Sequence, residues 1–163
     1  MRVRHIAALG ATVAIATAGA IALPSVAADA ATKGKISFVL TQSGNSASVI
    51  IHGAIDAGGK DTQPKDAYDV AHLAGGTLRI THPNKDATFK FKPDAKTCYY
   101  SFVGKGTYTL GHGTGKYQGV KGSGKYQIQG SGIAPKKNGS CNFNSNGGPF
   151  AGYATGGGPV TLP

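Results

Sequence analysis

Apolar and polar residues alternate with a period of two along most of the chain after residue 35. Residues 36–40 and 47–51 alternate on either side of the turn-forming segment 42–45, and this pattern predicts a β-hairpin. Residues 87–92 alternate phenylalanine with lysine in the same way. No window combines helical periodicity with strong helix formers, so the pattern predicts an all-β domain.

Further strands are expected at residues 70–73, 77–82, 98–103 and 159–162, and turns at 56–59 and 83–86. We expect residues 60–65 to form a polar loop, and the Gly- and Asn-rich stretch that starts at residue 138 to form loops before the last strand. The predicted fold is a small antiparallel β-barrel of about eight strands, with a β-sandwich as the alternative. Its expected apolar lining is Ile36, Phe38, Leu40, Val49, Ile51, Leu78, Ile80, Phe89, Phe91, Tyr108, Tyr117 and Tyr126.

A short repeat lies in the middle of the glycine-rich region. The sequence Gly-Thr-Gly-Lys-Tyr at 113–117 returns as Gly-Ser-Gly-Lys-Tyr at 122–126. This repeat predicts two short strands joined near 120–122, with glycines at bends or close backbone contacts. Residues 119–125 also match a phosphate-binding loop, but Tyr126 replaces the required Ser or Thr and no helix is expected to follow, which excludes that function.

The segments 113–126, 53–59 and 75–78 together resemble the allene oxide cyclase barrel-like family, which includes exported bacterial proteins and is related to plant allene oxide cyclases and dirigent proteins. The likeness covers most of the chain after the expected signal peptide in layout, but only these segments in residues. It implies an eight-stranded antiparallel barrel. The plant cyclases rely partly on a buried glutamate, and this chain has no Glu, so the resemblance transfers no catalytic residue.

The N-terminus has the features of a Sec-type signal peptide. Arg2 and Arg4 precede an uncharged apolar run from residue 6 to residue 23, and small residues follow Pro24. We expect cleavage after Ala28 or Ala30, which leaves residues 31–163 as a single secreted or envelope-associated domain. An uncleaved membrane anchor is the alternative.

Cys98 and Cys141 are the two cysteines of the chain. An even number of cysteines in an exported protein favours a disulfide over two free buried thiols. We expect this bridge to hold the C-terminal segment against the strand that begins near Cys98.

Charge is distributed unevenly in this basic chain, which carries 17 Lys and Arg against 7 Asp and Glu. All the acidic residues precede residue 95. The acid-free half is therefore expected to attract an anionic envelope polymer or lipid surface, although solubility alone would also explain it. Nucleic acid is disfavoured as a partner because no recognition motif accompanies the lysines. The candidate basic surface consists of Lys105, Lys116, Lys121, Lys125, Lys136 and Lys137.

The sequence contains no recognisable catalytic motif, and it predicts no cofactor and no metal site. The histidines at 52, 72, 82 and 112 are spaced too irregularly for a zinc motif. The pattern therefore favours a non-enzymatic binding or surface-associated barrel. The alternative is a dirigent- or cyclase-like barrel that acts on a small apolar substrate in its lumen. An open lumen with polar groups near Tyr99, Tyr108 or His82 would favour the alternative. The sequence leaves the oligomeric state open.

Overall fold

The computed structural model describes residues 31–83, 85, 87–145 and 147–163, and in this part the chain is all-β. The predicted signal peptide and its cleavage site lie outside the described residues. Among the described residues, no helix is long and apolar enough to cross a membrane. The elements are β1 (Thr32–Ser43), β2 (Ser46–Gly53), β3 (Ala57–Lys65), β4 (Tyr68–Leu73), β5 (Gly76–Thr81), β6 (Thr88–Pro93), β7 (Tyr99–Gly111), η2 (Gly115–Tyr117), β8 (Lys121–Ile133), β9 (Lys136–Lys137), β10 (Ser140–Cys141) and β11 (Phe150–Leu162).

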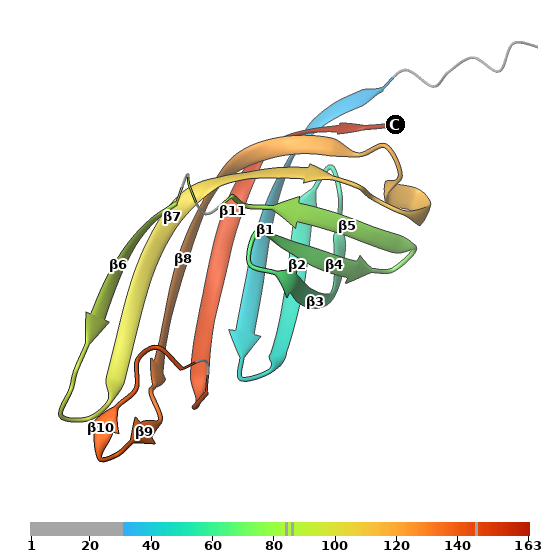
Figure 1. The fold of residues 1–163 in the computed structure, drawn as a ribbon. Coiled ribbons are helices and arrows are strands. Elements are labelled where there is room, and N and C mark those ends of the chain that lie inside the picture. Colours follow the sequence, from blue (N-terminus) through green and yellow to red (C-terminus); the bar gives the residue numbers. More distant parts are fainter. Residues whose placement is uncertain (1–30, 84, 86, 146) are drawn as a thin grey trace, which may run out of the picture.

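Eight antiparallel strands close into a barrel, as the sequence predicted. The strand order is β5-β4-β3-β2-β1-β11-β8-β7, and β5 pairs with β7 to close the ring (Figure 1). This closure uses only the end of β7, where Ile80 pairs with Leu110. The first half of β7 pairs instead with β6, the one described strand of this sheet that lies outside the ring. A long lip made from β6, β7, β8 and β11 therefore projects from one end of the barrel (Figure 1).

The core is the inner face of the barrel, and its members follow the predicted alternation. Most of the predicted lining is buried and belongs to one hydrophobic cluster, and Leu40 is half-buried. The exceptions are Phe89 and Phe91, which are 55% and 50% exposed. Both side chains are on the expected face of β6. They are exposed because β6 is outside the ring, so no opposite wall covers them.

The glycine-rich repeat does not form the predicted pair of short strands. The hairpin is built from β7 and β8 in full length, and the first copy of the repeat lies in the loop that joins them. That loop includes η2 and closes one end of the barrel, where the Tyr117 hydroxyl donates a hydrogen bond to the Ala74 carbonyl at 3.2 Å. Within this copy Gly115 has a positive φ angle, a backbone conformation that a strand does not have.

Two further segments differ from the prediction. Residues 57–65 form β3, so the turn predicted at 56–59 and the loop predicted at 60–65 are both wrong, and β11 begins at Phe150, well before the predicted strand at 159. The composition of β3 is poor for a strand because it contains two glycines, a proline and several charged residues. Pairing with β2 on one side and β4 on the other holds β3 in the barrel despite this composition.

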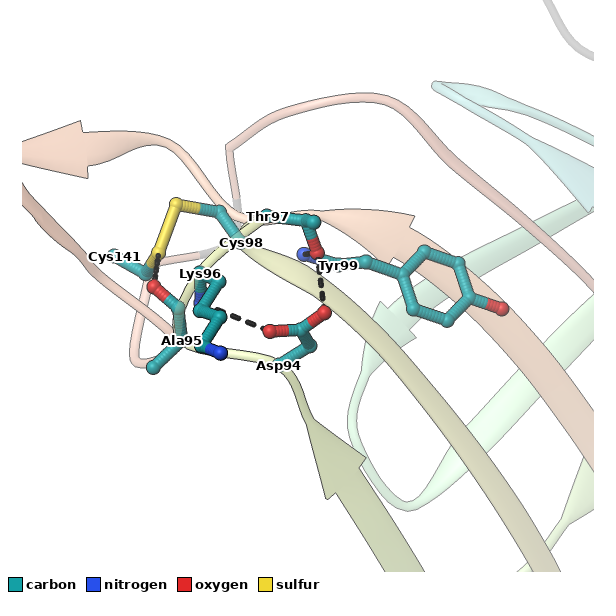
Figure 2. Close-up of a disulfide and its surroundings, with 7 residues drawn as sticks. All are labelled: Asp94, Ala95, Lys96, Thr97, Cys98, Tyr99 and Cys141. Carbon is teal, nitrogen blue, oxygen red and sulfur yellow. Dashed lines mark hydrogen bonds between the residues drawn. A yellow bond between two sulfur atoms is a disulfide. The ribbon is translucent and has the colours of Figure 1, made fainter.

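A disulfide joins Cys98 to Cys141, as predicted, with their Cα atoms 5.2 Å apart (Figure 2). Cys141 belongs to the small β9–β10 hairpin that follows β8. Cys98 lies directly before β7, and its φ angle is positive. The bridge therefore ties the β9–β10 hairpin to the loop between β6 and β7.

Candidate functional site

The end of the barrel opposite η2 is open and contains a cavity of about 500 Å³. This volume is within the range of small-molecule binding sites. Apolar side chains from β1, β5, β6, β8 and β11 line one part of it. Polar or ionisable side chains from β1, β3, β4, β7 and β8, together with His82 directly after β5, line the rest. The apolar group is Phe38, Leu40, Ile80, Phe89, Ile128 and Ala154, and the polar or ionisable group includes Gln42, Asp61, Thr62, Asp69, His82, Tyr108 and Tyr126.

Neighbouring strands bring three ionisable groups together on the inner face. Asp61 lies on β3, Asp69 on β4, and His82 directly after β5. The side-chain alternation of each strand turns these groups inward beside apolar neighbours such as Ala71 and Ile80. Asp61 is only 4% exposed, and it is the one buried charged side chain among the described residues.

The surroundings of Asp61 and His82 raise the pKa values of both side chains. Burial, and then the negative charge of Asp69, raise the pKa of Asp61 to about 7. His82 Nε2 lies 2.9 Å from a carboxylate oxygen of Asp69. The two groups form an ion pair when His82 is protonated. Contact with Asp69 raises the pKa of His82, and partial burial opposes this effect.

Two tyrosines face the cavity from the opposite wall. Tyr108 is 1% exposed and packs edge-on against Phe38, with ring centroids 5.0 Å apart. Its hydroxyl makes no hydrogen bond to any described residue, and neither does one carboxylate oxygen of Asp61. Burial raises the pKa of Tyr108. Tyr108 and Asp61 both line the cavity, so its wall contains two unpaired buried polar groups, and such groups cost free energy unless a ligand or water pairs with them.

The inner face of the barrel continues onto the lip as a row of aromatic rings. Phe102 stacks parallel to Phe150 with centroids 5.9 Å apart, and Phe89 lies 6.5 Å from Phe102. The rings of Phe102 and Phe150 cover Gly130, where an added Cβ would lie 2.9 to 3.0 Å from them. Because Phe89 also lines the cavity, the cavity and this aromatic lip form one continuous surface.

The six lysines of the candidate basic surface are all exposed, but the fold separates them. Lys105 on β7 and Lys125 on β8 line one shallow groove, and Lys121 is on the same outer face of β8. Lys116 lies in η2, at the closed end of the barrel. Lys136 and Lys137 lie in β9, beyond the other end of β8, roughly 40 Å away at the usual rise per residue (Figure 1).

The histidines do not converge on one point. His52 is exposed and contacts Asp56, and His72 shares a hydrogen bond of 3.0 Å with Thr62. Of the four histidines in the part of the chain that the structure describes, only His82 lines the cavity. Among the described residues, no group of three or more His, Cys, Asp or Glu is arranged to hold a metal ion.

Sequence reasoning missed Asp61 and Asp69 as site residues. Asp61 falls in the segment that was expected to be a polar loop, and an aspartate in a loop is normally solvated. The available signal was weak: an acid at an inward position of a strand is visible only once residues 57–65 are recognised as a strand. Tyr99, which the sequence associated with a lumen, lies on the outer surface and is 46% exposed.

No family model, curated protein or solved structure matches this chain. The resemblance to the allene oxide cyclase barrel-like family therefore stays a prediction that rests on the three glycine-rich segments.

Proposed function

We propose that this protein is an exported β-barrel that binds a small, largely apolar molecule in the cavity at the open end of its barrel. The observation that carries the proposal is the pair of unpartnered buried groups, Asp61 and Tyr108, that face this cavity. The apolar wall would bury the body of the ligand, and these two groups would bind an oxygen-bearing end. The aromatic lip extends the apolar surface beyond the mouth.

Filling the cavity should abolish ligand binding. Ala154 is 9% exposed and lines the cavity, so Ala154→Phe would place a ring inside it. Ala151, on the same strand, points outward and is exposed, so Ala151→Phe is a matched control. In titrations with the apolar fluorescent dye phenyl-naphthylamine, we expect the wild type and Ala151→Phe to bind and Ala154→Phe not to bind. Far-ultraviolet circular dichroism checks that both variants fold. Equal dye binding by both variants would contradict the proposal.

A matched pair of ligands tests the polar end of the site. Naphthol and naphthalene differ by one hydroxyl, and both can be measured by displacement of the dye. A hydrogen bond from Tyr108 or Asp61 should favour naphthol by about fivefold, which corresponds to roughly 1 kcal/mol. Tyr108→Phe removes one hydrogen-bond partner of the naphthol hydroxyl, so it should reduce the preference for naphthol without changing the affinity for naphthalene.

The same cavity supports the enzymatic alternative, a dirigent- or cyclase-like reaction. With a pKa of about 7, Asp61 is present in both protonation states near neutral pH and could give or accept a proton. If the barrel is an enzyme, Asp61→Asn should keep dye binding and lose turnover.

A second candidate function is electrostatic attachment to an anionic envelope polymer or lipid surface. The observation in its favour is the groove shared by Lys105 and Lys125. We expect the mature domain to co-sediment with purified cell envelope at low salt and to be released at high salt, because exposed charges are screened over about 8 Å at physiological ionic strength. Lys105→Gln with Lys125→Gln should weaken retention, whereas Lys136→Gln with Lys137→Gln tests the distant pair. If the amount of protein that co-sediments with the envelope is the same at low and high salt and in both double variants, the role of these lysines is solubility.

A further inference from the structure

A second groove lies on the outer face of the sheet, where β1, β11, β8 and β7 run side by side. Its volume is about 500 Å³, the same as that of the cavity inside the barrel. The residues that line it carry no charge and include two exposed tyrosines, Tyr99 and Tyr153. The lining is Thr41, Gln42, Tyr99, Ser101, Phe102, Val103, Gln129, Gly130, Ser131, Ala151, Gly152 and Tyr153.

Strand register places the two tyrosines at opposite ends of a polar diagonal. Tyr153 is paired with Gln129, and Tyr99 is paired with Ile133, four residues further along β8. With ordinary strand spacings the two Cα atoms are roughly 16 Å apart. Ser131 and Ser101 are paired with each other and occupy the row between them. In the described part of the chain, neither serine makes a side-chain hydrogen bond, so both hydroxyls remain free for a partner.

Tyr99 is held in place by the loop that precedes it (Figure 2). The Asp94 backbone N–H donates to the Tyr99 carbonyl at 2.8 Å, and the Tyr99 N–H donates to the Thr97 hydroxyl at 3.3 Å. Thr97 in turn donates to the Asp94 carboxylate at 2.8 Å. The disulfide at Cys98 fixes the same loop to the β9–β10 hairpin. These bonds fix the backbone of Tyr99, and with it the direction in which the exposed side chain leaves β7. A fixed backbone reduces the entropy that is lost when a partner binds.

We propose that this outer groove binds a neutral oligosaccharide. The faces of sugar rings present C–H groups that pack on tyrosine rings, and their edges present hydroxyls that pair with serine and glutamine. Tyrosine combined with small polar side chains is a combination that suits adaptable recognition of polar partners. The uncharged lining of a groove in a chain with a net charge of +10 fits a neutral partner better than an anionic one. Lys90 and Lys92 border the groove on β6 but do not line it.

The length of the groove indicates a chain of several sugars rather than a single one. The partner would lie across β11, β8 and β7, with one ring on Tyr153 and another on Tyr99. This site shares only Gln42 with the cavity inside the barrel, so its occupancy does not depend on the proposed function.

Calorimetric titration with cellohexaose, chitohexaose and maltohexaose tests the proposal. We expect at least one of these neutral hexasaccharides to bind with an affinity that changes little between low and high salt. Tyr99→Ala and Tyr153→Ala should each weaken binding by about fivefold or more, as expected for the loss of one aromatic contact. Ile50→Ala is the control, because Ile50 is 64% exposed on the same outer surface but outside the groove.

The two variants of β11 in which an alanine is replaced by phenylalanine provide a reciprocal control. Ala151→Phe should block the groove and abolish saccharide binding while leaving dye binding intact, and Ala154→Phe should have the opposite effects. The proposal is overturned if none of the three saccharides binds, if Ala151→Phe binds them as the wild type does, or if high salt abolishes binding. If Ala154→Phe still loses dye binding in those cases, the proposed function stands.

Discussion

Replacing Cys98 and Cys141 by serine is expected to lower the free energy of unfolding by about 4 kcal/mol. The bridge closes a loop with a sequence separation of 43 residues, and the chain-entropy model gives this magnitude for a loop of that length. Equilibrium denaturation in urea, with and without a reducing agent, measures the loss. Wild-type protein under reducing conditions should match the double serine variant.

The location of the bridge predicts which segments lose stability first when it is removed. The disulfide links the loop before β7 to the β9–β10 hairpin, far from the strand pairs that close the ring. Hydrogen exchange should therefore rise most around residues 94–99 and 136–141 when the bridge is removed, while β1 and β2 stay protected. A stability unchanged by reduction, together with thiols that react in the non-reduced protein, would mean that the bridge does not form.

The barrel is expected to lose roughly 2 kcal/mol of stability as the pH rises from about 5 to about 8, a figure that allows for solvent reaching the cavity. The folded-state pKa of Asp61 is about 7, above its ordinary value of 3.8, so across this range the folded chain binds more protons than the unfolded chain. Stability then falls with rising pH. His82 acts in the same direction, because its pKa is also raised and its contribution is lost as the pH passes through the folded-state value.

Asp61→Asn should flatten this pH dependence, because an amide fills the same space without titrating. Asp66→Asn is the matched control, since Asp66 is an exposed carboxyl at the same end of the barrel. Melting temperatures measured across the range give the comparison. The carboxylates of Asp56 and Asp94 have lowered pKa values, so they affect stability only at more acidic pH, with the opposite sign. A wild-type profile that is flat or rises between about pH 5 and about pH 8 would contradict the burial of Asp61.

Local pattern was sufficient for the parts of this fold in which side chains alternate between a buried and a solvated face. Residues 36–40 and 47–51 predicted β1, β2 and their turn, because an apolar residue at every second position has one face on which to be buried. Pairing of the two cysteines followed from their number and the expected export. Where glycine replaces side chains, as in residues 113–117, alternation carries no information, and the sequence predicted a strand in place of the η2 loop.

Tertiary structure decided which residues line the cavity. β3 is a strand because its neighbours pair with it, and only that pairing buries Asp61 beside Asp69 and His82. Phe89 and Phe91 are exposed because β5 closes the ring on β7 and leaves β6 outside, a choice of partner between segments distant in sequence. The sequence by itself determined which residues share a face of each strand. Which faces enclose a cavity depended on ring closure, since that is set by long-range pairing that no local period encodes.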